Sequence, residues 1–351
     1  MAQTDWLGLK KELPPRRRLV LAVLSFVLPL LIWSAVSYLP WLWHPFVRIT
    51  APGDAGLYDE GTYLPVADFK QQVAEAQAQK IAPPEGVLTN PVYLPAPHEV
   101  ARALYTAFTT EPRLQGDPWF HEALGHSIRT IFWGFVLSSL VGVPLGILCG
   151  SFRFFAKLHE PFIEFFRYLP APVFGTLCIA VLDIDDAPKI AIIVIGTFFQ
   201  QVLVIANTVR KVDPALIEAA QTLGASRWAL VRRVIIPASI GDIYTDMRIL
   251  LGWAWTYLII AEVVGTMSGI TLFLTQQARW RHYDNVYAGI LMIGFIGFGT
   301  DLLLAKLGTV LFPWKRARGA AGKRTWIGWI REPGPAWRKP VRKITPVPAQ
   351  P

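Results

Sequence analysis

The sequence predicts an all-α integral membrane protein, a polytopic bundle of about six transmembrane helices. Composition is the first reason: 53% of the 351 residues are hydrophobic and 17% are charged, whereas a soluble domain carries about 25% charged residues. The second reason is a series of long apolar runs separated by polar stretches. A helix needs about 20 apolar residues to cross a bilayer, and the runs at 19–42, 128–149, 162–182, 190–209, 248–267 and 286–312 reach that length.

The first run follows Arg16, Arg17 and Arg18, which are typical of the cytoplasmic side of a span. A cleaved signal peptide is the alternative, because Ser34-Ala35-Val36 loosely matches a small-residue cleavage site. The apolar run is longer than a signal core and continues to Trp43. We therefore expect a retained span, and in either case the next segment lies outside.

Residues 43–126 form a long insertion that begins rich in proline and glycine. Within it, residues 68–80 predict a short polar helix and residues 99–108 an amphipathic one, with Val100, Leu104 and Phe108 four apart on one face. Two interpretations stay open. The insertion is a periplasmic cap or docking surface, or it is a passive loop resting on the spans.

The second run carries small residues every four positions, at Gly134, Ser138, Gly142 and Gly146. Such a stripe lets another helix approach closely. In the third run Pro170 and Pro172 interrupt the apolar pattern, and Asp183, Asp185 and Asp186 form an acidic turn after it. The only cysteines, Cys149 and Cys178, lie in apolar runs and predict plain core residues.

Residues 213–237 (DPALIEAAQTLGASRWALVRRVIIP) are the one polar stretch between spans that predicts a folded object. Asp213 and Pro214 suit a helix start, and Gly224 suits the left-handed residue after a helix end. Ser226 suits the cap of a second helix over 227–236 that Pro237 would help terminate. The apolar side of this second helix comprises Trp228, Leu230, Val231, Val234 and Ile235, and its solvent-facing side comprises Arg227, Arg232 and Arg233.

Glu218-Ala219-Ala220, then Gly224, then Pro237, resembles the EAA loop of ABC importer permeases in letters and spacing. The flanking residues are similar to the nitrate/taurine/sulfonate/bicarbonate branch of that family. They are Leu94-Pro95-Ala96-Pro97, Gly252-Trp253-Ala254-Trp255 and Ala261-Glu262. The likeness covers roughly residues 92–313, and it departs from the usual pattern at Val234 and Gly241.

The resemblance implies a type I ABC importer permease fold and a transport subunit without enzymatic activity. In that family the loop seats in a groove of a separate ATPase, which binds ATP and Mg²⁺, and carries its motion to the membrane helices. It implies two ATPase copies, a permease homodimer, a periplasmic binding protein and a small solute, such as the anions nitrate, sulfonate, taurine or bicarbonate. Glu218, Ala219, Ala220, Gly224 and Pro237 would be the coupling residues, with Gly224 allowing a sharp bend and a close approach that a Cβ would obstruct.

The implied organisation has a cytoplasmic N-terminus over 1–18, a first span over 19–42, the insertion over 43–126, a permease core over 127–312 with its cytoplasmic loop at 210–241, and a basic tail over 313–351. The Lys and Arg residues of the short loops predict that both termini lie on the cytoplasmic side of a bacterial inner membrane. Of the 34 Lys and Arg, ten lie after Pro313, beside a single acid, Glu332. That distribution favours a lipid-facing tail over a nucleic-acid surface.

The sequence shows no catalytic arrangement, no histidine spacing that suits a metal and no Walker A motif. Polar residues inside spans are therefore the candidates for a substrate path, because they are costly in hydrocarbon and tend to face the bundle interior. They are Thr197, Gln200, Gln201, Trp253, Trp255, Thr256 and Glu262. For the glutamines, hydrogen bonding between helices is an equal alternative; for Glu262 and Asp301, structural pairing or a place at a span end is preferred.

Two other functions remain as hypotheses. A secondary transporter driven by an ion gradient would need inverted repeats or ionisable residues near mid-membrane, and neither is clear in the sequence. A non-transporting membrane scaffold would use the insertion and the tail for contacts. Uptake without an ATPase would favour the first, and absence of any uptake the second.

Overall fold

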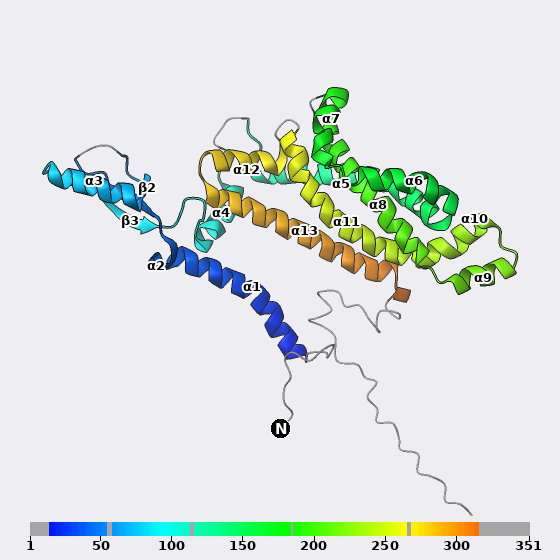
Figure 1. Ribbon diagram of the computed structural model, residues 1–351. Helices are drawn as coiled ribbons and strands as arrows, with labels where there is room; N and C mark the ends of the chain where they lie inside the picture. The colour runs from blue at the N-terminus through cyan, green and yellow to red at the C-terminus, as the bar shows by residue number, and fades with distance from the viewer. Residues whose placement is uncertain (1–13, 55–57, 113–115, 184, 265–267, 316–351) are drawn as a thin grey trace, which may run out of the picture.

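The computed structural model describes residues 14–54, 58–112, 116–183, 185–264 and 268–315 (Figure 1). The first thirteen residues and most of the basic tail, whose roles the sequence left open, lie outside the described residues. Within these described ranges, five helices are long and apolar enough to cross a membrane, and a sixth span is present if one bent helix pair is counted as a span. The expected bundle of about six transmembrane helices is confirmed.

The bundle has two ends that serve as reference points. One, which we term the loop end, carries α9 (Pro214–Thr222) and α10 (Arg227–Leu230). The other, the insertion end, carries α4 (Pro97–Thr109) and α12 (Gly269–Arg279). Figure 1 shows these two ends on opposite sides of the molecule, with the long helices running between them.

Helices α5 (Phe120–Ser151) and α8 (Asp186–Arg210) form the centre of the bundle. They run side by side in the same direction, because Gly134 faces Ile193 while Gly146, further along, faces Ile205. A Cβ at Gly134 would lie 2.6 Å from Ile193 Cγ2, and one at Gly146 would lie 2.8 Å from Ile205 Cβ. The close helix approach expected along the small-residue stripe is confirmed.

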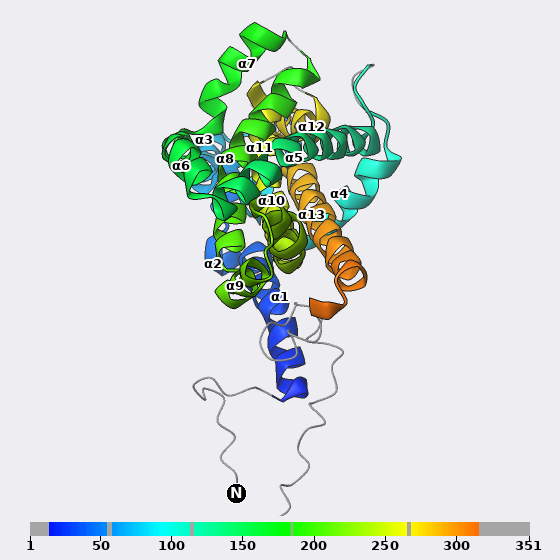
Figure 2. The ribbon, with the colours of Figure 1, turned by 90° about the vertical axis from the view of Figure 1, so that its right-hand side faces the viewer.

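The third apolar run is not one straight span. α6 (Arg153–Phe166) begins directly after α5, and the chain then bends by 88° into a 3₁₀ turn, η1 (Ala171–Phe174), and α7 (Gly175–Leu182). The prolines at 170 and 172 explain the break, since each lacks an amide hydrogen and disfavours helical backbone before it. The interruption that the sequence predicted within 162–182 is confirmed, and it separates two arms, of which α7 projects from the bundle in Figure 2.

The first span lies close to its expected position. α1 (Pro15–Tyr38) starts and ends four residues before the predicted 19–42, and α2 (Pro40–Trp43) follows it. None of the apolar window of α1 is buried. Near its end, Trp33 Nε1 donates to the Pro95 carbonyl at 3.0 Å and the Trp33 ring stacks on Tyr287. α1 therefore contacts the rest of the chain at its insertion end, where Tyr38 also meets His98.

The insertion contains strands that the sequence analysis did not predict. β1 (Phe46–Ala51) pairs antiparallel with β2 (Tyr63–Pro65) and β3 (Glu85–Thr89), in the order β2-β1-β3. α3 (Val66–Ala78) covers this sheet, and α4 packs against α13 (Tyr283–Leu311) through Val100, Ala103 and Ala288. The two predicted helices of the insertion are confirmed, and α5 already starts at Phe120, within the predicted insertion over 43–126.

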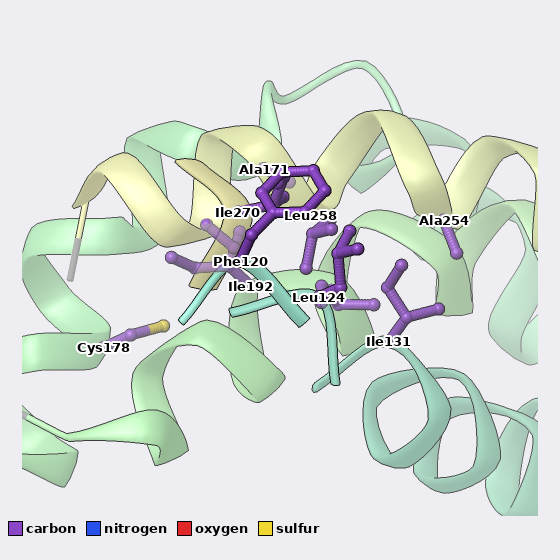
Figure 3. Packing of buried hydrophobic residues seen from close by; sticks show 11 residues of the cluster. Phe120, Leu124, Ile131, Ala171, Cys178, Ile192, Ala254, Leu258 and Ile270 are labelled. Atoms are coloured by element: carbon purple, nitrogen blue, oxygen red, sulfur yellow. The ribbon is translucent and has the colours of Figure 1, made fainter. Parts of the chain in front are cut away.

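The main apolar core lies toward the insertion end and joins α5, α8, α12 and the long helix α11 (Ile236–Val264). Figure 3 shows Leu124, Ile192, Leu258 and Ile270 meeting in this core. The second cysteine, Cys178, lies at its edge, and both cysteines are buried and unpaired. The prediction that they are plain core residues is confirmed.

Candidate functional site

The loop between α8 and α11 folds as the sequence predicted at its first helix. Asp213 caps α9, because its side chain accepts a hydrogen bond from the Ala215 amide at 3.0 Å, and Pro214 occupies the first helical position. No residue of α9 is buried. Glu218 and Ala219 are exposed and Ala220 is half-buried, and Ile217 of the same helix packs against the apolar cluster at the loop end of the bundle.

Gly224 ends the first helix in the left-handed conformation, with φ +80°. The Ala225 amide donates to the Ala220 carbonyl at 3.0 Å, and the Gly224 amide donates to the Gln221 carbonyl at 2.9 Å. This pair of bonds is the Schellman motif, which satisfies carbonyls that a helix end leaves free. The sharp bend is confirmed. The close approach is not seen inside this chain, since a Cβ at Gly224 would meet nothing within 4 Å.

The second helix differs from the prediction at Pro237. Ser226 caps it as expected, accepting from the Ala229 amide at 3.4 Å. α10 then passes into a π turn, η2 (Val231–Ile235), and straight into α11, so Pro237 lies within the helix and does not terminate it. The Ile236 amide donates to the Val231 carbonyl, five residues back. The wider turn comes directly before the proline, which itself has no amide hydrogen for a regular helical bond.

Residues 227–264 consequently form one helical rod of 38 residues, about 57 Å long at 1.5 Å per residue. At the loop end the rod is fixed by an apolar cluster in which Val231, Ile235 and Ile243 meet Ile205 and Val209 of α8. Of the side chains predicted to form the apolar side of the second helix, Leu230, Val231 and Ile235 are buried, and the prediction is confirmed for these three. The second helix of the loop, α10, therefore continues without a break into the long helix α11.

The outer side of the loop carries apolar side chains that are exposed in the part of the chain that the structure describes. Leu223 is 88% exposed and Trp228 is 65% exposed, and Leu216 is also exposed. Trp228 was expected on the buried side, but it lies at the surface with an edge contact to Phe152. We term Leu216, Leu223 and Trp228 the loop knob. Exposed apolar groups on a rigid, capped support are typical of a protein interaction site.

Six of the seven candidate path residues divide into two groups, and Glu262 stands apart. Thr197 and Gln201 are buried and bonded within the chain. Gln201 accepts from Ser138 at 2.8 Å and donates to Ser139 at 2.9 Å, which links α8 to α5. These contacts match the alternative of interhelical bonding that the sequence left open, so a contact with solute is not needed to explain Gln201.

The second group lies at the surface of the chain. Trp253 and Thr256 are exposed on one side of α11, Gln200 and Trp255 are half-buried, and Trp255 lies beside Gly297 of α13. A role for these side chains in a path stays a prediction. Glu262 is unlike either group, because it is fully buried and accepts hydrogen bonds from Ser127 and the Thr271 amide.

Sequence reasoning missed two polar contacts inside the bundle. Arg248 of α11 binds Asp301 of α13 through both terminal oxygens, with Nη2 at 2.8 and 2.9 Å. Lys189, buried in α8, donates to Asp186 and to Ser268. A basic residue at the start of an apolar run was the available signal in both cases. The pairing of Asp301 agrees with the structural role preferred for it.

Among the described residues, no three His, Cys, Asp or Glu side chains are grouped to hold a metal ion. No helix was predicted from the sequence between the apolar runs at 248–267 and 286–312. The helix α12 lies there, and its first residues, Gly269, Ile270 and Thr271, are buried.

Gln201 gives a testable consequence. Replacing it by leucine removes two hydrogen bonds between helices, which in membrane proteins contribute about 1 kcal/mol or less. We expect Gln201→Leu to lower the thermal stability of the detergent-solubilised chain by a few degrees and to leave uptake unchanged, whereas Trp253→Ala should reduce uptake without that shift. Loss of uptake by Gln201→Leu at normal stability would instead place Gln201 in the path.

Comparison with known proteins identifies the family to which this architecture belongs. Residues 142–313 match the model of the binding-protein-dependent transport system inner membrane component family. A probable ABC transporter permease protein of Brucella abortus (strain 2308) is 33% identical over 227 residues, which cover 65% of this chain and 88% of the relative. The chain belongs to the ABC transporter permease family.

Two further relatives of this permease have named solutes. The taurine transport system permease protein TauC of Escherichia coli (strain K12) is 30% identical over 227 residues, covering 65% of this chain and 82% of the relative. The aliphatic sulfonates transport permease protein SsuC of Bacillus subtilis (strain 168), itself a tentative assignment, is 30% identical over 199 residues, covering 56% and 72%. The family model begins within α5, so α1 and the insertion lie outside it.

Proposed function

We propose that this permease is the membrane subunit of an ABC importer whose separate ATPase grips the loop knob and α9. Two copies of the permease would form the pathway, and two copies of the ATPase would bind ATP and Mg²⁺. The observation that carries the proposal is the exposed, capped loop on a continuous rod: Leu223 and Trp228 face outward while Val231 and Ile235 are fixed in the bundle. A partner that pulls on this loop moves the rod directly.

The loop end is cytoplasmic in this proposal, and the insertion end faces the periplasm of a bacterial inner membrane. Arg16, Arg17, Arg210 and Lys211 lie near the ends of spans that would then all face inward. α1 is retained as a span, with both chain termini inside. The sheet of the insertion, together with α3 and α4, stands on the side where a periplasmic binding protein would arrive.

The solute in this proposal is a small anion, and a sulfonate such as taurine is the first to test. The relatives TauC and SsuC support it through their names. Within this chain, Gln200 and Trp253 present an amide and an indole group at partly or fully exposed positions, whereas the Thr256 hydroxyl already donates to the Trp253 carbonyl at 2.6 Å. Neutral hydrogen-bond donors of this kind suit an anion that must be released again.

The deciding experiment is a gentle-detergent pull-down of the tagged chain from its own host. We expect an ATPase with Walker motifs to co-purify at about one copy per permease chain, because the described residues leave the loop knob exposed. Absence of any ATPase in several detergents, together with uptake that needs no ATP, would overturn the proposal in favour of a gradient-driven transporter. Absence of both ATPase and uptake would favour a scaffold.

Leu223→Arg tests the loop knob itself. Because Leu223 is 88% exposed, the substitution should leave the fold and the membrane level unchanged, since exposed changes alter stability by about 0.5 kcal/mol or less. We expect the co-purified ATPase to fall by about tenfold, as removal of a central apolar anchor costs 1.4 kcal/mol or more. Thr222→Arg, at the neighbouring exposed position, is the matched control for added charge, and equal ATPase recovery from both variants and wild type would exclude Leu223 from the interface.

A further inference from the structure

A fully buried acidic side chain lies where the rod reaches the insertion end. Glu262 has an exposed fraction of 0%. Its Oε1 accepts a hydrogen bond from Ser127 Oγ at 2.5 Å, and its Oε2 accepts one from the Thr271 amide at 3.0 Å. Burying an acidic group is costly unless its oxygens are bonded, so this arrangement must be supported by its surroundings.

The partners of Glu262 lie at the start of α12. The first amides of a helix have no acceptor within it. In α12 the Thr271 amide bonds to Glu262, and the Ile270 amide donates to Ser127 Oγ at 2.9 Å. Ser268, at the capping position, makes no cap of its own and lies against Lys189 Nζ at 2.5 Å. The start of α12 is therefore held by side chains of α11, α5 and α8.

The backbone of Gly269 shows how closely these groups fit. Its φ is +67°, a conformation that favours glycine. A Cβ there would lie 2.1 Å from Glu262 Oε1 and 2.5 Å from Ser127 Oγ. The carboxyl group and the hydroxyl thus approach the α12 backbone at a distance that a glycine alone permits, which is independent evidence of a built contact.

This contact joins α12 to the rod. Glu262 lies near the end of the helical rod 227–264 opposite to the loop knob, and Figure 1 shows α12 beside the insertion end of α11 and along α13. We propose that Glu262 is a positioning residue for transport: with Ser127 it caps α12, so that α12 follows the rod when the loop is moved. The proposal rests on the proposed ATPase partner. It replaces a direct contact of Glu262 with solute, because both carboxyl oxygens are used within the chain.

The test uses the whole complex in lipid nanodiscs and measures amide hydrogen exchange. In wild type, trapping the ATPase with ADP and vanadate should change exchange in both the loop, residues 213–230, and α12. In Glu262→Ala, α12 amides should exchange about tenfold faster at rest, because the cap is lost. On trapping, the loop should still respond and α12 should not. Glu164→Gln, at an exposed position of α6, is the matched control.

Glu262→Gln serves if the alanine variant fails to accumulate. Its carbonyl can accept from the Thr271 amide while its NH₂ donates to Ser127, so exchange in α12 should rise by only about threefold. Unchanged exchange in either variant would overturn the cap. Faster exchange with a normal response of α12 to trapping would overturn the transport role and leave a structural one. A wild-type chain without ATPase overturns the proposed function, and its resting exchange still reports on the cap.

Discussion

Gly224→Asp is expected to abolish uptake while the permease still inserts and accumulates in the membrane. Gly224 has φ +80°, and a Cβ there would meet no atom of this chain within 4 Å. The chain itself therefore loses only the conformational advantage of glycine, about 1 to 2 kcal/mol at most. The new carboxylate, however, stands beside Leu223 on the surface proposed to seat in the ATPase, where an unpaired charge is expensive to bury.

The measurement is uptake of labelled taurine by host cells, together with recovery of the ATPase in the pull-down. We expect both to fall by about tenfold or more, as for a central interface residue. Gly224→Asn is the matched control, since asparagine tolerates the left-handed conformation and adds similar volume without charge. It should retain much of the ATPase. Normal uptake by Gly224→Asp would contradict the coupling role of this turn.

The features of the loop that the sequence predicted are local ones. Asp213, Ser226 and Gly224 act on amides and carbonyls within five residues of themselves, so their residue types suffice to place two helices and a turn. Span lengths follow in the same way from apolar runs. The stripe beginning at Gly134 predicted a close helix contact, although it did not identify α8 as the partner.

The features that were missed depend on residues far apart in the chain. Strand β1 pairs with β3 through contacts such as Val47 with Leu88. Buried and exposed residues do alternate along β1, from Val47 to Thr50, but β2 has only three residues, too few for a clear alternating pattern. Pro237 was expected to end a helix, because proline lacks an amide hydrogen, but the preceding π turn and the buried Ile235 allow the helix to continue. Sequence reasoning had no means to find this tertiary compensation.

Glu262 illustrates the same limit within the candidate site. As an acidic residue in an apolar run it suggested either a path or a structural pair. Its role depends on Ser127, which is 135 residues away, and on the backbone of α12. Because the sequence analysis predicted no helix at 269–279, it could not identify the backbone of α12 as a hydrogen-bond partner of Glu262. The polar residue was therefore detectable, and the group that it binds was not.

Gly146→Leu is expected to prevent accumulation of the folded permease. A Cβ at Gly146 would lie 2.8 Å from Ile205 Cβ and 2.9 Å from the Val202 carbonyl oxygen of α8. One of these atoms is backbone, so α8 would have to move away from α5 along the centre of the bundle. Overpacking of a rigid contact costs about 3 kcal/mol or more, and membrane helices pack through such close approaches.

Gly125→Leu on the same helix is the matched control, because Gly125 is exposed and a Cβ there meets nothing within 4 Å. Both substitutions lower the flexibility of the helix backbone and add the same apolar volume, so their difference isolates the α5–α8 contact. We expect size-exclusion chromatography in detergent to show a monodisperse peak for Gly125→Leu and aggregate or no protein for Gly146→Leu. Equal folded yields would mean that α5 and α8 are not packed through Gly146, and the parallel alignment of these two helices would then be wrong.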